Sequence, residues 1–191
     1  MSDTTRTRIR NVFAQHLATT GYQGLSLDAV AREAGIKKPT LYHHFPGGKE
    51  TIYAEVAHDF IETQHTALAA AIATEGDLSA RLVAIVDAFA DPAAAQVSFG
   101  QRLFDALPFV AAEIRDEVSS SYVSKLLTPV EELFRVAIAD HHVREDEPSF
   151  LANAFLHLAR ATDLDPGNPQ MAHRLVALFL DGAHGNVPTT S

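Results

Sequence analysis

A run of polar side chains able to bind nucleic acid lies between residues 37 and 44 of this 191-residue sequence. The run reads KKPTLYHH and offers two ammonium groups, two imidazoles, a phenol and a threonine hydroxyl. Such donors contact phosphate oxygens and base edges in the major groove of DNA. So many polar groups cannot all find buried partners in so small a unit. The pattern therefore predicts an exposed segment that reads DNA.

Two short helices are expected to position this segment. Ser26 is a good N-cap for the first, and Gly35 ends it because glycine tolerates the left-handed conformation found there. Pro39 suits the first turn of the second helix, which runs to about Phe45 and is broken by residues 46–48. Two short helices joined by a tight glycine-containing turn form a helix-turn-helix.

Apolar spacing predicts helices along the rest of the chain. One covers about residues 6–20 and stops at Gly21, and a long one starts near Lys49. Further helices are expected over about residues 78–90, 94–106, 109–140, 148–163 and 168–183, with Pro129 kinking or dividing the third of these. No run alternates as a strand does. We therefore predict an all-α protein of about nine helices, with a three-helix head over residues 1–50 and a helical body over 51–191.

The charges are distributed unevenly between head and body. Residues 1–50 carry seven Lys and Arg against four acids, a balance of +3. The other 141 residues carry eight bases and twenty acids, a balance of −12. A basic head meets phosphates while an acidic body is repelled by them, which orients the encounter. Arg6, Arg8 and Arg10 are interpreted as a general electrostatic arm.

Several protein classes are disfavoured by what the sequence lacks. It has no cysteine, which excludes disulfides, thiolate catalysis and cysteine-ligated zinc. No apolar run is long enough for a membrane span, and the first residues lack the apolar core of a secretion signal. No acid–base pair or positioned nucleophile is legible. We expect a cytoplasmic protein that is neither an enzyme nor a membrane protein, without cofactor.

One alternative is a metal-responsive regulator. His58, Glu62 and His65 fall at i, i+4 and i+7 on one face of a helix. The outer two positions are about 10 Å apart, which is long for one ion. A site without cysteine would need these side chains and histidines from elsewhere in the chain. The alternative is kept, and no residue is predicted to be a metal ligand.

The stretch from Leu25 to Thr51, LSLDAVAREAGIKKPTLYHHFPGGKET, resembles the DNA-binding motif of the TetR family of bacterial transcriptional regulators. The resemblance covers about residues 8–55 and rests on AVAREAGI, PTLYHHF and KE in that order. The turn at residues 46–48 departs from the family, which more often has a single polar residue before the lysine. Two glycines there are expected to loosen the start of the fourth helix.

Chemistry and resemblance together predict the DNA contacts. Thr40 offers a hydroxyl, and a methyl group for thymine, while the lysines reach guanine acceptors or phosphate. The resemblance implies that Tyr42 and His44 clamp phosphate. The predicted DNA-binding residues are Ser26, Lys37, Lys38, Pro39, Thr40, Tyr42, His43, His44 and Lys49.

The body is rich in phenylalanine, and a stripe of this kind also fits an ordinary core. The resemblance implies a cavity between the middle helices that binds an inducer, here a small, largely apolar or aromatic one. Its candidate lining residues are Phe60, Phe89, Phe99, Phe104, Tyr122 and Phe134.

The last two helices resemble the family's four-helix dimer interface. The candidate interface residues are Phe150, Ala154, Phe155, Leu158, Leu175, Leu178 and Phe179. A symmetric pair of reading helices doubles the base contacts and selects a palindromic site. The sequence therefore predicts a homodimeric, sequence-specific regulator of transcription. The resemblance implies a repressor that its ligand releases from the operator. An activator with the same fold is the alternative, because repression or activation depends on where the operator lies relative to the promoter.

Overall fold

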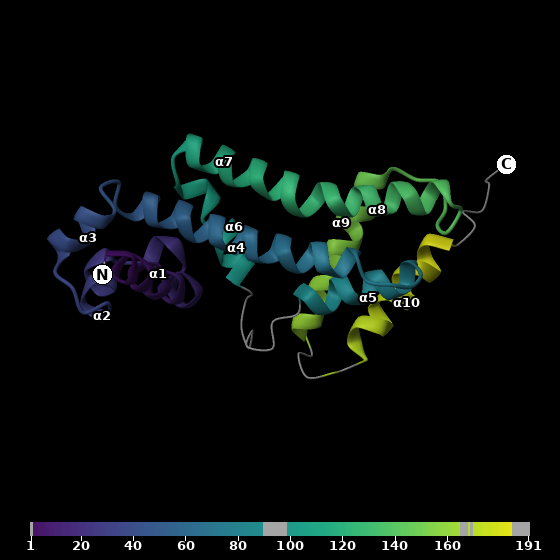
Figure 1. The fold of residues 1–191 in the computed structure, drawn as a ribbon, viewed down its shortest axis with the longest axis horizontal. Helices are drawn as coiled ribbons and strands as arrows, with labels where there is room; N and C mark the ends of the chain where they lie inside the picture. Colours follow the sequence, from purple (N-terminus) through teal and green to yellow (C-terminus); the bar gives the residue numbers. More distant parts are fainter. Residues whose placement is uncertain (1, 90–98, 165–167, 169, 185–191) are drawn as a thin grey trace. The chain divides into compact units, whose positions relative to one another are not determined.

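The computed structural model describes residues 2–89, 99–164, 168 and 170–184 (Figure 1). Within these residues all regular structure is helical, so the all-α prediction is confirmed. The α-helices are α1 (Ser2–Gly24), α2 (Leu27–Glu33), α3 (Lys38–His44), α4 (Lys49–Ile72), α5 (Leu78–Phe89), α6 (Phe99–Asp105), α7 (Ala112–Tyr122), α8 (Thr128–Ala139), α9 (Pro148–Ala159) and α10 (Met171–His184). Three shorter turns are the 3₁₀ turns η1 (Leu107–Phe109) and η3 (Arg160–Leu164) and the π-helical turn η2 (Val123–Leu127).

Two predicted helix ends differ from the structure. α1 begins at Ser2, earlier than expected, and its backbone leaves the helical conformation at Gly21 (φ 68°, ψ 171°) before continuing to Gly24. The predicted stop at Gly21 is therefore a kink. The helix expected over residues 94–106 is described only as α6, because residues 94–98 lie outside the described part of the chain.

The segment expected over residues 109–140 is divided, as Pro129 indicated. α7 gives way to the π-helical turn η2, and Pro129 lies in the first turn of α8. The backbone stays right-handed helical at Leu127 and Thr128, so η2 runs into α8 without a break. The π-helical turn changes the hydrogen-bond spacing just before the proline, whose nitrogen has no hydrogen to donate.

The chain packs as two compact units. One comprises Met1–Ile61 and Gln96–Ser121, and the other Glu62–Ala95 and Tyr122–Ser191. These units follow packing, whereas the predicted division at residue 50 concerns which residues bind DNA and stays a prediction.

In the first unit, α2 lies beside α1 and α3 packs on α2 (Figure 1). α1 buries Ile9, Phe13 and Leu17 completely, at the spacing of one helix face. α6 packs on α1 and is also joined to α4, where the Phe60 ring lies edge-on to Phe99 at 5.4 Å between centroids. α6 therefore belongs to the same core as the helix-turn-helix.

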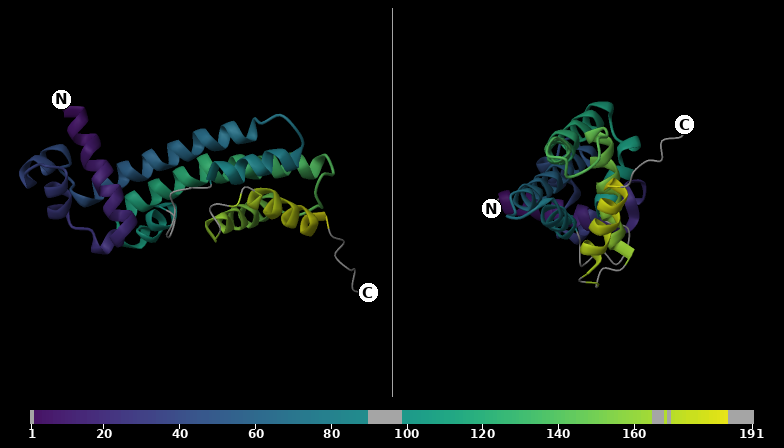
Figure 2. Two further views of the ribbon diagram at one scale, coloured as in Figure 1. Left: turned by 90° about the horizontal axis from the view of Figure 1, so that it is seen from below. Right: turned by 90° about the vertical axis from the view of Figure 1, so that its right-hand side faces the viewer.

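In the second unit, α9 and α10 lie side by side (Figure 2), and α8 packs on α9. An aromatic cluster joins these helices: Phe134 lies 5.9 Å from Phe155 and 5.6 Å from Phe179, and the latter two are 5.2 Å apart, between ring centroids. Aromatic pairs at such distances stabilise a core beyond the area that they bury.

Within the described residues, no helix is both long and apolar enough to cross a membrane.

Candidate DNA-binding surface

The helix-turn-helix is built by a glycine turn between α2 and α3. Gly35 has φ +66°, its N–H donates to the carbonyl of Arg32, and the N–H of Ile36 donates to the carbonyl of Ala31 at 2.9 Å. This pair of bonds is the Schellman arrangement, which satisfies the last carbonyls of a helix. The predicted role of Gly35 is confirmed.

Below this turn, apolar side chains hold the two helices together. Val30, Leu41 and Phe45 are completely buried, as predicted. Ile36, which was expected in the same core, is only half-buried. One side of α3 is therefore fixed against the unit, which leaves its other side free to face a ligand.

The polar side chains of α3 lie outward. Those predicted to bind DNA are exposed at residues 37–40, 42 and 43, and His44 is half-buried with its ring edge-on to that of His43. The prediction that this segment protrudes is confirmed. Its contact with DNA stays a prediction.

Lys38 is held by an acid of α2. Its ammonium lies 2.8 Å from the carboxylate of Asp28, and both side chains are exposed. The hydrogen bond to Asp28, and then its charge, raise the pKa of Lys38. Ser26 stands at the N-cap of α2 as predicted, is exposed, and makes no capping hydrogen bond through its side chain. Ser26 and the Lys38–Asp28 pair therefore both lie at the surface of the helix-turn-helix.

Tyr42 is seated on the glycine turn before α4. Its side chain is 42% exposed, and a Cβ placed on Gly48 would meet its Cε1 atom at 3.2 Å. Gly48 has φ +63°, and its N–H donates to the carbonyl of Phe45 at 2.8 Å. The positive φ favours glycine at this position, and a larger residue would press on the Tyr42 ring. The expectation that two glycines loosen this turn stays a prediction.

Lys49 is placed differently from the lysines of α3. Its Nζ atom lies 4.3 Å from the centroid of the Tyr22 ring, a cation–π contact. Burial lowers the pKa of Lys49. Burial also raises the pKa of Tyr22 to about 12, with a further contribution from the charge of Glu50. The ammonium is thus tied to the core at the start of α4.

Arg6 and Arg10 are not a free electrostatic arm, and that interpretation is corrected. Arg6 forms an ion pair with Glu55, and Arg10 lies 2.7 Å from Asp59. Arg8 alone of the three is exposed. The partners were missed, although a signal existed: the two arginines are four residues apart on α1, and the two acids are four apart on α4. Equal spacing lets two helix faces pair their charges.

The candidate ligand-binding residues fall into both units. Phe60 and Phe99 contact each other in the first unit, where Phe104 is half-buried. In the second unit Phe134 belongs to the buried aromatic cluster, and Phe89 and Tyr122 are half-buried. Since Phe134 is completely buried and packs against Phe155 and Phe179, it is a core residue of this unit.

The candidate dimer residues also divide. Phe155 and Leu175 are buried within their own unit, and Phe179 contacts the cluster. Phe150 is 54% exposed and Leu178 is 65% exposed, while Ala154 and Leu158 are half-buried. Phe150, Ala154, Leu158 and Leu178 therefore keep surface for a partner.

The histidines considered for metal binding have separate contacts. His58 lies 2.8 Å from a carboxylate oxygen of Glu117, and Nδ1 of His65 lies 2.9 Å from the carbonyl oxygen of Lys125. Glu62 pairs with the ammonium of Lys125. In the part of the chain that the structure describes, no three His or acidic side chains gather as a metal site would need.

This surface defines a helix-turn-helix protein whose reading helix is anchored on one side and polar on the other. Residues 10–56 match the family model described as "Bacterial regulatory proteins, tetR family". This match confirms the resemblance to the TetR family that the sequence motif indicated. The all-helical fold is shared with solved structures of TetR-family proteins.

Relatives agree with this assignment over different lengths. The HTH-type transcriptional regulator LmrA of Bacillus subtilis (strain 168) is 43% identical over 42 residues, which is 22% of this chain and 22% of that protein. The match therefore spans under a quarter of that relative.

Two solved structures cover nearly the whole chain. A bacterial regulatory protein in the tetR family from Rhodococcus RHA1 has a TM-score of 0.79 at 16% identity, covering 96% of this chain and 98% of that one. AibR, solved in complex with isovaleryl coenzyme A and operator DNA, has a TM-score of 0.72 at 17% identity, covering 94% and 98%. At these identities the likeness establishes the fold alone.

Proposed function

We propose that this TetR-family regulator acts in the cytoplasm as a homodimer that represses transcription from a palindromic operator and is released by a small, largely apolar or aromatic ligand. The observation that carries the proposal is the two-sided character of α3. Leu41 is completely buried, whereas Lys38, Thr40 and Tyr42 are exposed on the same seven-residue helix. A helix held on one side and polar on the other fits the major groove.

Dimerisation is supported by the surface of the last two helices. Phe150, Ala154 and Leu158 recur every four residues along α9, so they share one face. On α10, Leu178 is 65% exposed. Large apolar side chains that remain exposed in one chain favour a second copy as their cover.

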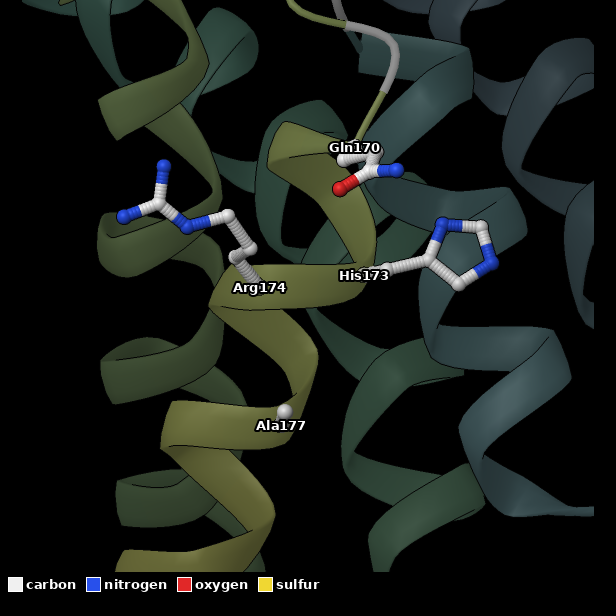
Figure 3. A pocket seen from close by; sticks show the side chains of 4 residues that line it. All are labelled: Gln170, His173, Arg174 and Ala177. Carbon is white, nitrogen blue, oxygen red and sulfur yellow. The ribbon is translucent and has the colours of Figure 1, made fainter.

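A hollow on α10 lies beside Leu178 in sequence. It has a volume of about 440 Å³ and is lined by Gln170, His173, Arg174 and Ala177. His173 and Arg174 extend to opposite sides of the helix (Figure 3), so these two side chains do not converge on one small ligand. This arrangement fits a contact surface better than a ligand site.

A ligand of apolar character is supported by the aromatic side chains of the body. Phe60 packs so closely on α6 that a Cβ on Gly100 would meet its Cζ atom at 3.0 Å. A ligand that inserted an apolar group near Phe60 and Phe99 would displace α6, which shares a core with the helix-turn-helix. Of the similar structures, AibR was solved with an acyl thioester and operator DNA, which supports a ligand with an apolar portion.

The experiment is a selection of genomic fragments by the purified full chain, followed by affinity measurement on the recovered duplexes. We expect a palindrome with half-sites about one helical turn apart. Promoter activity in a reporter strain, with and without the protein, then distinguishes repression from activation. Lower promoter activity supports repression, and higher activity shows an activator. A protein that retains no duplex above random sequence contradicts the proposal.

Ligand control is tested separately from DNA binding. A panel of acyl thioesters and free aromatic acids is added to the protein–operator complex, and the affinity is measured for each. One compound should weaken operator binding at least tenfold while binding the free protein. If all compounds that bind the protein leave operator affinity unchanged, release by ligand is wrong.

A further inference from the structure

We propose that Arg6 is a positioning residue for α3: it holds the C-terminal end of the reading helix and thereby sets the angle at which that helix meets DNA. This inference rests on the DNA-binding function proposed above. A basic N-terminal helix suggests that Arg6 contacts phosphate. The present inference gives Arg6 a different role.

The guanidinium of Arg6 joins three elements. Its Nη1 atom donates to the carbonyl oxygen of His44, the last residue of α3, at 2.7 Å. Its Nε atom donates to Glu55 of α4 at 3.1 Å, and Nη2 donates to the second oxygen of the same carboxylate. Its Cζ atom lies 4.4 Å from the centroid of the Phe45 ring. Only a planar fork makes these contacts together.

The contacts fall where a short helix needs them. The last carbonyls of an α-helix have no partner within it. α3 has seven residues, and the residue after it, Phe45, leaves the helical conformation (φ −133°, ψ 79°) with its ring completely buried. Arg6 therefore fixes two consecutive residues, one by its carbonyl and the next by its ring. Any tilt of α3 must break these contacts.

A second arginine holds the partner of Arg6 in place. Arg10 lies 3.9 Å from Glu55 and 2.7 Å from Asp59, one turn further along α4. The Arg6 side chain is 38% exposed, so its ion pair contributes little to stability. What the arrangement provides is orientation, because both oxygens of Glu55 accept from one edge of the Arg6 guanidinium, which leaves Nη1 directed at the carbonyl of His44.

Four variants separate positioning from phosphate contact. Arg6→Gln removes the fork, and Arg8→Gln removes the same charge from an exposed site on the same helix. Arg6→Lys keeps the charge but not the planar fork. Glu55→Gln removes a negative charge, which by electrostatics alone would strengthen DNA binding. Affinity for the selected operator and for a random duplex is measured as a function of salt.

If Arg6 positions α3, Arg6→Gln lowers operator affinity roughly tenfold or more, because base contacts need an accurately placed helix. Its affinity for random duplex then changes no more than that of Arg8→Gln. Arg6→Lys does not restore operator affinity, and Glu55→Gln lowers it. Far-ultraviolet circular dichroism confirms that each variant is folded, and Glu55→Gln decides the matter should Arg6→Gln fail to fold.

Three results overturn the inference while leaving the proposed function intact. The first is an Arg6→Gln variant that behaves as Arg8→Gln, and the second is a Glu55→Gln variant that binds the operator as well as the wild type. The third is an Arg6→Lys variant with restored affinity, together with an Arg6→Gln variant whose affinity depends less steeply on salt, by about one unit of slope for each head; this pair of results identifies a phosphate contact. A wild-type chain that binds no duplex overturns the proposed function, and this inference with it.

Discussion

The hydroxyl of Tyr53 donates a hydrogen bond of 2.9 Å to the carbonyl oxygen of Leu103, inside the first unit. The Tyr53 ring is completely buried, and its centroid lies 5.4 Å from that of Tyr22, which in turn contacts Lys49. Burial, and then the neighbouring Tyr22, raise the pKa of Tyr53. One buried hydroxyl thus ties α6 to α4, at the helix whose first residue is a candidate DNA contact.

Tyr53→Phe should lower the free energy of unfolding by about 1 kcal/mol, the usual net contribution of one hydrogen bond. The phenylalanine ring keeps the packing, so only the hydrogen bond is lost. In a chain of this length such a loss corresponds to a fall in Tm of about 2–4 °C. Urea denaturation measures it, with Tyr42→Phe as the control at an exposed ring. Equal stabilities of both variants and the wild type would show that the bond contributes nothing.

Gly48→Ala should weaken DNA binding, whereas Gly35→Ala should weaken it less. Both glycines have positive φ, +63° and +66°, so alanine costs about 1–2 kcal/mol of stability at either site. Only at Gly48 does the added Cβ meet another group, the Tyr42 ring at 3.2 Å, and nothing lies within 4 Å of it at Gly35. Operator affinity measured for the pair isolates the displaced tyrosine. Equal losses of operator affinity in the two variants would show that Tyr42 does not contribute to DNA binding.

Thr40→Ala should relax the base preference at one position of each half-site, at a cost of about 1–3 kcal/mol for the preferred base. Lys37→Ala should instead weaken binding to all sequences and reduce the salt slope. Both side chains are exposed, Thr40 on α3 and Lys37 at its N-cap. Affinities for operators substituted at each position, measured at two salt concentrations, separate the two patterns. A uniform loss for Thr40→Ala would show that its hydroxyl contacts the backbone and not a base.

Stability should fall as the pH rises from 10 to 12, and Tyr22→Phe should reduce that fall. The folded-state pKa of Tyr22 is raised to about 12 from an ordinary 10.0, so its contribution is complete below pH 10 and is lost through this window. The lowered pKa of Lys49 acts in the opposite direction, and Tyr22→Phe retains that lysine and the ring beneath it. Urea midpoints at several pH values provide the measurement. Parallel pH profiles for variant and wild type would show that the Tyr22 hydroxyl is not buried.

Leu178→Asp should dissociate the dimer, because a carboxylate would be buried in the proposed contact between copies. Val123→Asp is the matched control, since Val123 is 47% exposed on η2, outside that contact. Sedimentation velocity measures the oligomeric state. Operator affinity should fall on the order of a hundredfold, as the second head loses its tether. A dimeric Leu178→Asp protein would place the interface elsewhere.

Features that depend on neighbouring residues were predictable from the sequence. The turn at Gly35 and the place of Pro39 in the first turn of α3 follow from backbone preferences that act within a few residues. The buried faces of α1 and α3 follow from apolar spacing, and the exposure of the polar side chains among residues 37–43 follows from the absence of local partners for so many polar groups. The family motif lies in the same stretch, which is why the DNA-binding surface was legible.

Partner choice between distant residues was decided only by tertiary structure. Arg6 and Glu55 are 49 positions apart, and the sequence around either residue does not indicate the other as its partner. The same holds for Lys49 with Tyr22, and for Phe155, predicted at a dimer interface but buried against Phe134 and Phe179. Spacing shows which residues share a helix face, but the packing of whole helices determines what that face meets. For this reason the sequence suggested a general electrostatic role for Arg6, whereas the tertiary structure places it in contact with the end of α3.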